Sequence, residues 1–447
     1  MSHHPPRPTS PRDLALLRLD RARLPGWRSN LISRPPPDTE PSPRDAALVE
    51  VLYVGCVKSL FPLRHRVSHH AGKPLHAIDE LVQKILVLAA WQLTGMDNIP
   101  PAIAVDQAVE QCRRFARRSA APLVNAVLRN FARQPPPPPP SDDLPLPQLW
   151  ELRHGIPAAL TLALLAEFDT ATAQAIAAHA NLTPPLLLRL FPGVTIDDLS
   201  AALAPLDSPP ALLPHTQLGM VVAQHARRDH LAALARAGLA QVQDATAAAA
   251  LDLADLRPGQ TVLDRCAGSG TKTLHMQSLV GPTGAVHAIE PNPHRCQQLS
   301  SLAAARNISN LTVHTASTLA AAHLSTPQCF DRILLDVPCS NSGVLARRPE
   351  ARFAPPPSSQ SPSHRSLQKL QLDLLDDTAP ALRTGGLLIY STCSIWKSEN
   401  SLQVRQFLST HPHFTLQAEH QHLPTASSNT PDTYRDGGYT ASMLRVR

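Results

Sequence analysis

Two short stretches of this 447-residue chain place a cysteine and a serine just after an apolar segment. In the first, Asp336-Val337-Pro338-Cys339-Ser340 follows Ile333-Leu334-Leu335, a run typical of a buried strand. In the second, Thr392-Cys393-Ser394 follows the apolar run 387–390. Parallel strands bring their carboxyl ends to one edge of a sheet, where α/β folds bind ligands. A single such cysteine could simply be a buried turn residue, but two at one edge favour a reactive pair.

Two thiols beside an acid suit the methylation of a pyrimidine ring. Carbon 5 of the ring is not nucleophilic by itself, but a thiolate that adds to carbon 6 creates an enamine whose carbon 5 can attack a methylsulfonium. Carbon 5 must then lose its proton and the thiol must leave, which requires a base. Asp336 is placed to stabilise the adduct near ring nitrogen 3. A free thiol is mostly protonated at neutral pH, so the site must favour the thiolate. The residues alone leave open whether Cys339 or Cys393 attacks.

A glycine-containing loop is the candidate cofactor site. It joins a predicted strand at 261–264 to a predicted helix at 273–280 and consists of Cys266, Ala267, Gly268, Ser269, Gly270, Thr271 and Lys272. A phosphate-binding P-loop does not fit, because Thr271 precedes Lys272 and position 266 is not glycine. A dinucleotide fingerprint does not fit either, because residue 273 is threonine.

The remaining interpretation is a class I methyltransferase loop that binds S-adenosylmethionine. Its glycines let the backbone approach the ligand, and the helix N-terminus favours the ligand's carboxylate. Glu290 ends the next predicted strand, where an acid can accept hydrogen bonds from both ribose hydroxyls. Asp336 also faces this cofactor in the prediction.

The elements that must position these residues alternate between strands and helices. Further strands are predicted at 285–290, 311–315, 332–336 and 387–390, with helical segments between them. Such alternation predicts a parallel sheet with right-handed crossovers. Residues 241–447 are therefore expected to form an α/β, Rossmann-like methyltransferase domain.

The N-terminal part of the chain has a different sequence pattern. Residues 1–134 predict an all-α bundle, with helices at 44–60, 78–93 and 123–131 and another that begins at Pro100-Pro101. The proline-rich segment 135–147 is predicted to be a linker. Residues 148–240 are expected to form a small, mainly helical subdomain that connects the two parts and binds RNA, with one short strand near 186–190.

Charge is unevenly distributed along the chain. The net charge is +6, yet residues 1–134 carry 19 Lys and Arg against 11 Asp and Glu. A basic module beside a near-neutral one indicates a nucleic-acid partner. Within it, Arg113, Arg114, Arg117 and Arg118 form either a solvated helix face or an RNA-facing patch.

Several classes of protein are excluded by composition. The seven cysteines include no C-x-x-C pair, so neither a zinc site nor a disulfide framework is expected. No apolar run approaches the length of a membrane span, and the first residues lack the apolar core of a secretory signal. We therefore expect a cytoplasmic monomer without a metal or a membrane partner.

Two family resemblances extend this interpretation. The helix after Asp45, Asn98-Ile99-Pro100-Pro101-Ala102-Ile103-Ala104-Val105 and Val124-Asn125-Ala126-Val127-Leu128-Arg129 resemble the NusB-type RNA-binding fold. The C-terminal part resembles the RNA cytosine-5 methyltransferases of the Nol/Nop/Sun type. The motifs that carry this second resemblance are Asp264-x-Cys266-Ala267, Gly270-x-Lys272-Thr273, Asp336-x-Pro338-Cys339-Ser340-x-x-Gly343, Arg347-Arg348-Pro349-Glu350, Gln371, Thr392-Cys393-Ser394, Glu399-Asn400 and Asp436-Gly437-Gly438-Tyr439.

The resemblance implies roles for individual residues. By it, Cys393 is the nucleophile and Cys339 assists release of the product. The combination with a NusB-like front is similar to bacterial enzymes that methylate small-subunit (16S) rRNA, and it adds Arg347 and Arg348 as candidate RNA-binding residues.

The chain also departs from the family pattern. The usual loop Cys-Ala-Ala-Pro-Gly-Gly-Lys is here Cys-Ala-Gly-Ser-Gly-Thr-Lys, and the Asp expected after the third strand is replaced at Ala316 or Ser317. Ser317 can still hydrogen-bond the cofactor, but without charge. The Asn expected shortly after Arg189 is missing. An alternative is therefore an RNA-binding assembly factor with a degenerate methyltransferase fold.

Overall fold

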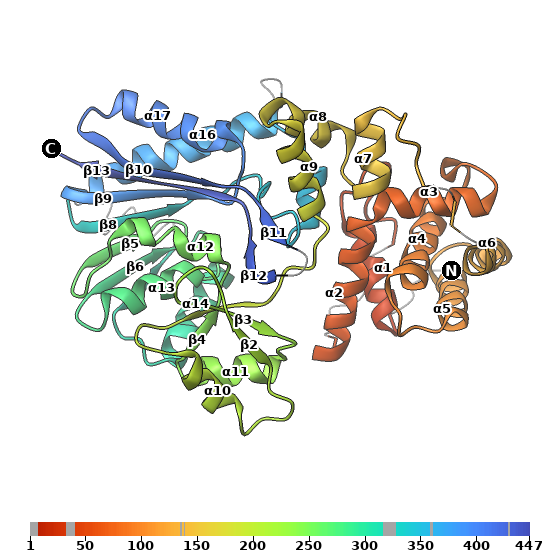
Figure 1. The fold of residues 1–447 in the computed structure, drawn as a ribbon, viewed down its shortest axis with the longest axis horizontal. Coiled ribbons are helices and arrows are strands. Elements are labelled where there is room, and N and C mark those ends of the chain that lie inside the picture. Colours follow the sequence, from red (N-terminus) through yellow and green to blue (C-terminus); the bar gives the residue numbers. More distant parts are fainter. Residues whose placement is uncertain are drawn as a thin grey trace, which may run out of the picture. The chain divides into compact units, whose positions relative to one another are not determined.

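The structure, a computed structural model, describes residues 8–32, 41–134, 136–137, 139–315, 328–357, 361–427 and 430–447. The chain forms two compact units (Figure 1). The first extends to Ala173 and includes the short segment Arg352–Ala354, and the second contains the remaining residues from Gln174 onward.

The first unit is built from helices. They are α1 (Pro11–Arg21), α2 (Pro43–Lys58), α3 (Leu60–Ala71), α4 (Glu80–Gly95), α5 (Pro101–Phe115), α6 (Ala121–Arg133), α7 (Leu146–His154) and α8 (Ala158–Glu167), and α9 (Thr170–His179) leads into the second unit. Proline at the first turn of α2 and α5 and the Asp79 side chain at the N-terminus of α4 fix where these helices begin. The four predicted helices of this region are confirmed.

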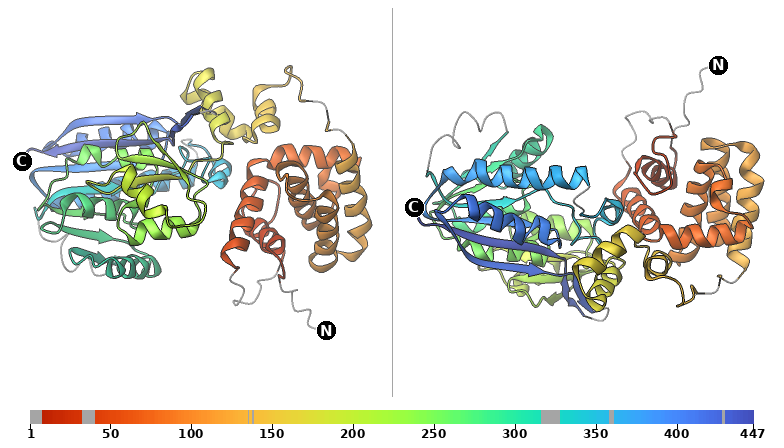
Figure 2. Two further views of the ribbon diagram at one scale, coloured as in Figure 1. Left: turned by 60° about the horizontal axis from the view of Figure 1, so that its bottom comes forward. Right: turned by 90° about the horizontal axis from the view of Figure 1, so that it is seen from above.

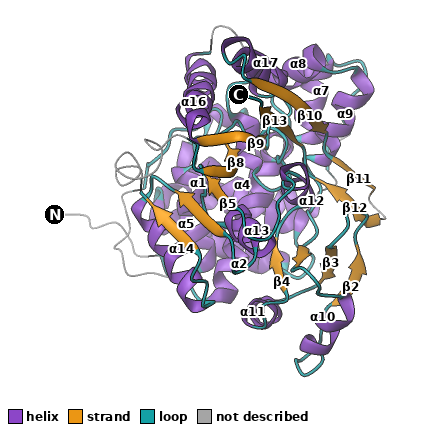
Figure 3. Ribbon diagram, turned by 90° about the vertical axis from the view of Figure 1, so that its left-hand side faces the viewer, coloured by secondary structure: helices purple, strands orange, loops and turns teal. Residues whose placement is uncertain are grey.

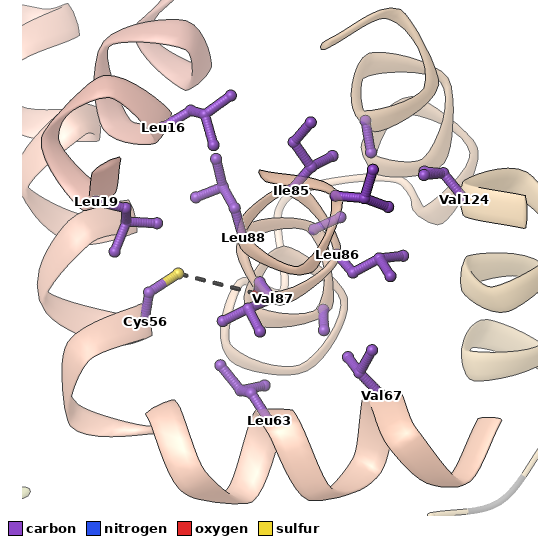
Figure 4. Close-up of a cluster of buried hydrophobic side chains, with 14 of the residues drawn as sticks. Leu16, Leu19, Cys56, Leu63, Val67, Ile85, Leu86, Val87, Leu88 and Val124 are labelled. Carbon is purple, nitrogen blue, oxygen red and sulfur yellow. Dashed lines mark hydrogen bonds between the residues drawn. The ribbon is translucent and has the colours of Figure 1, made fainter. Parts of the chain in front are cut away.

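Helix α4 is the centre of the first unit. Its residues Ile85, Leu86, Val87 and Leu88 are all fully buried, so this part of the helix is enclosed on every side (Figure 4). Lys84 is buried with them, and its ammonium nitrogen lies 2.8 Å from the Asp20 carboxylate and 2.6 Å from the Arg28 carbonyl oxygen. Removing one partner of such a buried pair typically costs about 3–5 kcal/mol, so the pair fixes the orientation of α4.

The second unit contains a seven-stranded sheet (Figure 3). Its strand order is β10-β13-β9-β8-β5-β6-β7. Its strands are β5 (Thr261–Asp264), β6 (Ala285–Ile289), β7 (Leu311–His314), β8 (Phe330–Asp336), β9 (Leu382–Thr392), β10 (Phe414–His422) and β13 (Gly438–Arg445). The five strands that the sequence predicts are β5 to β9, and each pairs with its neighbour in parallel. The antiparallel strands β10 and β13 complete the sheet next to β9.

Helices cover both faces of this sheet. Strand β8 alternates: Ile333 and Leu335 pack with Leu375 and Phe407, which lie on α16 (Pro362–Thr378) and α17 (Ser401–Thr410). Leu334 instead packs on the opposite face, against α13 (Thr271–Val280), and α14 (Pro293–Ala305) lies beside the cofactor loop through Leu299. A strand that is buried on both faces has a continuous apolar sequence, which is why β8 can be predicted from the sequence.

A smaller antiparallel sheet precedes the large one (Figure 2). It has the order β2-β3-β1-β4, formed by β1 (Leu187–Leu190), β2 (Ala211–Pro214), β3 (Met220–Gln224) and β4 (Ala240–Val242). Helices α10 (Ile196–Leu203) and α11 (Arg228–Arg236) pack on it, while α12 (Ala245–Ala249) leads toward β5. The sequence predicts β1 but not the other three strands. A two-stranded ribbon, β11 (Thr425–Ser427) with β12 (Thr430–Arg435), completes the unit.

In the described part of the chain, no single helix is long and apolar enough to cross a membrane; only α2 and α3 taken together, bent by 79°, have the length and composition.

Arg352 closes two helix ends in the first unit. Its guanidinium is buried and donates hydrogen bonds to the carbonyl oxygens of Lys58 and Gly155, at 3.0 and 3.3 Å. Lys58 is the last residue of α2, and Gly155 follows α7. The last carbonyls of a helix have no partner within the helix, so Arg352 supplies donors that these two ends lack.

We predict that Arg352→Ala destabilises the first unit by about 2–4 kcal/mol, because buried carbonyls lose their charged donor. Thermal unfolding followed by tryptophan fluorescence measures this, since Trp27, Trp91 and Trp150 lie in the first unit and only Trp396 in the second. The exposed Arg44→Ala is the control and should leave the melting temperature unchanged. Equal melting temperatures for the two variants would contradict the role of Arg352.

Candidate active site

The two cysteines of the predicted pair lie in contact. Strands β8 and β9 run parallel with Asp336 opposite Ser391, so their carboxyl ends reach the same height. Just beyond these ends, the Sγ atoms of Cys339 and Cys393 are 2.8 Å apart. Both cysteines are free and partly accessible. The arrangement is a hydrogen-bonded thiol pair at the edge where the sequence places it.

The turn after Cys339 shapes this pair. Asn341 adopts a left-handed backbone conformation with φ of +59°. Its side-chain N–H donates to the Cys339 carbonyl oxygen at 3.2 Å, and its Oδ1 accepts a hydrogen bond from the Cys393 thiol at 3.2 Å. Two residues later, a Cβ on Gly343 would lie 2.5 Å from the Gly437 carbonyl oxygen. Such crowding admits only glycine, so three backbone segments meet directly behind the thiols.

A buried carboxylate joins the two cysteine turns. Glu399 Oε2 accepts a hydrogen bond from the Ser340 backbone N–H at 2.8 Å, and Oε1 accepts one from the Ser394 hydroxyl at 2.9 Å. Gln371 on α16 donates to the same carboxylate at 3.2 Å and to the Pro338 carbonyl oxygen at 2.9 Å. Glu399 has no solvent exposure, so these donors replace the water that a buried carboxylate would otherwise lack.

The predicted acid Asp336 forms an ion pair beside the thiols. Its carboxylate lies 2.7 Å from the ammonium of Lys272, the last residue of the cofactor loop. Burial alone would lower the pKa of Lys272, but the charge of Asp336, and to a smaller extent Cys393, raises it above its ordinary value. The ammonium therefore stays charged at neutral pH and supplies a positive charge close to Cys393.

These residues line one pocket of about 650 Å³ in the second unit. Of the predicted site residues, it is lined by Asp336, Cys339, Cys393, Cys266, Gly268, Lys272, Glu290, Arg347 and Arg348. The loop residues Ala267, Ser269, Gly270 and Thr271 lie next to it at the start of α13. Ser317 lies outside the described residues. The pocket thus joins the thiol pair to the predicted cofactor loop.

The cofactor half of the pocket is held by buried acids. The carboxylate of Asp264 accepts from Thr273 Oγ1 at 2.6 Å and from the Cys266 backbone N–H at 3.3 Å, which ties both ends of the loop together. Burial raises the pKa of Asp264 to about 6 and that of the Cys266 thiol to about 12. Cys266 therefore stays a neutral thiol at neutral pH.

The donor set at this loop fits S-adenosylmethionine. Glu290 is buried at the end of β6, and one of its oxygens accepts from the Asn292 backbone N–H at 2.8 Å while its carboxylate faces the pocket, as ribose hydroxyls require. Gly268 and Gly270 have left-handed backbone conformations, with φ of +56° and +84°. The first turn of α13 presents backbone N–H groups that have no partner within the helix, which suits the carboxylate of the ligand's amino-acid part.

The candidate RNA-binding arginines are held in different ways. Arg347 lies on the pocket wall between two acids: its Nε is 2.5 Å from Asp436 and its terminal nitrogen 3.3 Å from Asp244. Burial and the neighbouring Asp244 raise the pKa of Asp436 to about 7. Arg348 lines the same pocket.

The arginine quartet lies in the first unit, at the end of α5 and in the turn after it. Arg114 is committed to Asp13 at 2.8 Å, whereas Arg113 and Arg117 make only loose ion pairs, at 3.7 Å with Glu110 and 4.0 Å with Asp79. Arg118 begins the 3-10 turn η2 (Arg118–Ala120). An RNA-facing role for this quartet stays a prediction.

Sequence reasoning missed three contacts of this site. Glu399 was part of a motif, but nothing in the sequence shows that its carboxylate joins both cysteine turns. The Lys272–Asp336 ion pair and the clamp of Asp244 and Asp436 on Arg347 were missed for the same reason, since each joins residues far apart in the chain. The only available signal was polar residues next to strand ends.

Two family models match the chain. Residues 251–442 match "16S rRNA methyltransferase RsmB/F", and residues 29–133 match the NusB family. The fold and the pocket define a methyltransferase of the S-adenosylmethionine-dependent class.

Whole-chain relatives narrow this class to a family. Ribosomal RNA small subunit methyltransferase B of Sodalis glossinidius is 30% identical over 421 residues, covering 92% of each chain. A probable ribosomal RNA small subunit methyltransferase B of Synechocystis is 26% identical, covering 91% of this chain and 92% of the relative. The chain belongs to the family of ribosomal RNA small subunit methyltransferase B.

Solved structures share the fold. The protein PH0851 superimposes with a TM-score of 0.71 at 19% identity, covering 91% of each chain. A methyltransferase homologue from Pyrococcus horikoshii gives a TM-score of 0.52 at 21% identity, covering 66% of this chain and 97% of the other. The cofactor of the chain is S-adenosylmethionine, as predicted. Among the residues that the structure describes, no group of three or more His, Cys, Asp or Glu could hold a metal ion.

We predict that Glu290→Ala weakens S-adenosylmethionine binding about 10- to 100-fold, because hydrogen bonds to a charged acceptor contribute about 1.5–3 kcal/mol each. Isothermal titration calorimetry on the full chain measures it. Glu167→Ala, a residue of the first unit, is the control and should bind as the parent does. An unchanged dissociation constant for Glu290→Ala would remove Glu290 from the cofactor site.

Proposed function

We propose that this protein methylates carbon 5 of a cytosine in small-subunit ribosomal RNA, through a covalent bond between Cys393 and carbon 6 of the base. The observation that carries the proposal is the contact between Cys339 and Cys393, 2.8 Å apart at the wall of the cofactor pocket. One thiol suffices for an attack on carbon 6; a second thiol in contact with the first supports a two-step device for attack and release.

The surroundings of the two thiols support different roles. Cys393 is the thiol whose charge contributes to raising the pKa of Lys272, so this sulfur is the one that interacts with the ammonium of the cofactor loop. The pKa of Cys339 is raised well above its ordinary value, by its hydrogen bond with Cys393, by burial and by nearby negative charge. Cys339 therefore holds its proton while Cys393 attacks.

The reaction can be followed through the residues of this chain. Cys393 Sγ forms a bond to carbon 6, and the Lys272–Asp336 pair faces the ring where nitrogen 3 becomes electron-rich. The bound cofactor supplies the methyl group as a methylsulfonium. After methyl transfer, the Cys339 thiol gives up its proton to solvent, and its thiolate then takes the proton from carbon 5. The bond between carbon 6 and Cys393 Sγ breaks, so Cys393 leaves as a thiolate and the double bond between carbons 5 and 6 is restored.

The relatives support ribosomal RNA as the substrate. Proteins named ribosomal RNA small subunit methyltransferase B match over nine-tenths of the chain, and the NusB-like front carries the positive charge that a phosphate backbone requires. We infer that the first unit holds the RNA, that Arg347 and Arg348 contact it beside the pocket, and that the enzyme acts in the cytoplasm as a monomer.

One alternative follows from the altered cofactor loop. A chain that kept the fold but lost turnover would act as an RNA-binding assembly factor. This alternative is suggested by the loop sequence Cys-Ala-Gly-Ser-Gly-Thr-Lys, which departs from the usual family loop. The intact Lys272–Asp336 ion pair and the contact between Cys339 and Cys393 favour a catalytic role. Calorimetry separates the two, because an assembly factor of this kind would not bind S-adenosylmethionine at millimolar concentration.

We predict that Cys393→Ala reduces methyl transfer to small-subunit rRNA by more than about 10³-fold, as removal of a covalent nucleophile does. Cys339→Ala should instead accumulate a covalent RNA–protein adduct, because attack proceeds and release does not. Transfer of a labelled methyl group and a denaturing gel measure the two outcomes.

Cys329→Ala is the matched control, because Cys329 precedes β8 at the opposite end of that strand from the pocket. It should methylate normally and show no adduct. Full activity of Cys393→Ala would contradict the mechanism, and so would a covalent adduct in a protein that lacks Cys393.

A further inference from the structure

Glu399 contacts the two cysteine turns in unequal ways. On the Cys339 side, its carboxylate accepts the backbone N–H of Ser340, the residue bonded directly to Cys339. On the Cys393 side, it accepts only a side-chain hydroxyl, that of Ser394. The Ser394 hydroxyl is shared further with Ser340 and Ser342, at 3.3 and 3.1 Å. The negative charge therefore lies against the Cys339 turn and is separated from Cys393 by a hydroxyl.

Glu399 cannot be rotated away from this position. Its side chain is fully buried, both oxygens are used as the ionised form of a carboxylate uses them, and Gln371 donates to one of them. The backbone is fixed as well, because the Tyr390 hydroxyl donates to the Glu399 carbonyl oxygen at 2.6 Å. A charge held this rigidly in a buried site acts more strongly than one in water.

The thiol pair is sensitive to such a charge. Two sulfurs 2.8 Å apart can share one proton, so the pair titrates as a unit: one proton leaves to solvent and the other stays on one sulfur. Which sulfur keeps it depends on the surrounding charges. A negative charge next to Cys339 favours S–H there, and a positive charge next to Cys393 favours S⁻ there.

We propose that Glu399 is a positioning residue that directs the shared proton onto Cys339 and so leaves the thiolate on Cys393. This inference rests on the proposed function, since it explains why one of two adjacent thiols becomes the nucleophile. Glu399 is not among the residues that line the pocket and acts only through the two turns.

The other titratable groups around the pair do not reverse this bias. Asp336 and Lys272 form an ion pair at 2.7 Å, so together they add no net charge beside the two thiols. The pKa of Tyr390 is raised well above its ordinary value by burial, so this group remains neutral. His364 on α16 is bonded to Ser398 at 3.1 Å, and burial lowers its pKa, so it is neutral at pH 7 and above.

The test is the pH dependence of alkylation of each cysteine in the full chain without RNA or cofactor. Initial rates with iodoacetamide are measured for Cys339 and Cys393 separately, by mass spectrometry of their peptides. The midpoint of each rate–pH curve does not depend on how accessible each sulfur is. We expect a lower midpoint for Cys393 than for Cys339. An equal or lower midpoint for Cys339 would overturn the proposal, and this comparison needs no variant.

Glu399→Gln sharpens the test, because glutamine keeps the shape and removes the charge. In this variant, the midpoint of Cys339 should fall by about one pH unit, and the Cys393-to-Cys339 rate ratio at neutral pH should fall about tenfold. Asp373→Asn is the control: Asp373 lies on the same helix as Gln371 but forms an exposed ion pair with Lys369, and its loss should move neither midpoint. A Glu399→Gln protein that melts as the parent does and keeps both midpoints would overturn the proposal.

The outcome separates this inference from the proposed function. If Cys393→Ala still methylates RNA, the proposed function fails whatever the midpoints are. If Cys393 is essential but its midpoint is not the lower one, only the role of Glu399 fails.

Discussion

The parallel pairing of β8 with β9 is the constraint on which the site depends. Because Asp336 lies opposite Ser391, the two strands end at one height and the turns that follow must share the same small space. Cys339 and Cys393, which are 54 residues apart in the chain, therefore meet at 2.8 Å. A shift of one residue in this register would turn one of the strand ends toward the other face of the sheet. The contact between the two thiols is thus a consequence of sheet geometry.

Charges around the pocket are fixed before any substrate binds. Lys272 is paired with Asp336, Arg347 is held by Asp436 and Asp244, and Glu399 is held by donors from three segments. Each group is ordered by partners of the protein itself, so little reorganisation is needed when a base enters. A buried, half-satisfied network would be costly, which explains why so many polar residues gather within a few positions of the strand ends.

Local patterns predicted much of this molecule, and long-range contacts account for what they missed. Strands β5 to β9 and helices α2, α4, α5 and α6 follow from apolar periodicity and, for α5, from Pro100-Pro101 at its start. The short strands β2 to β4 were not predicted, because runs such as 211–214 and 240–242 are too brief to show alternation. Both thiols were found because they follow apolar runs directly. Glu399 and the partners of Arg347 were not, because their significance lies in contacts that only the folded chain creates.

The central claim is that the product is a carbon-5 methylated cytosine in small-subunit rRNA. The most direct measurement incubates the purified full chain with unmodified small-subunit rRNA and isotope-labelled S-adenosylmethionine, digests the RNA to nucleosides and separates them by mass spectrometry. We predict that the label is found in 5-methylcytidine. Label in any other methylated nucleoside, or rRNA that remains unlabelled while the protein binds the cofactor, would contradict it.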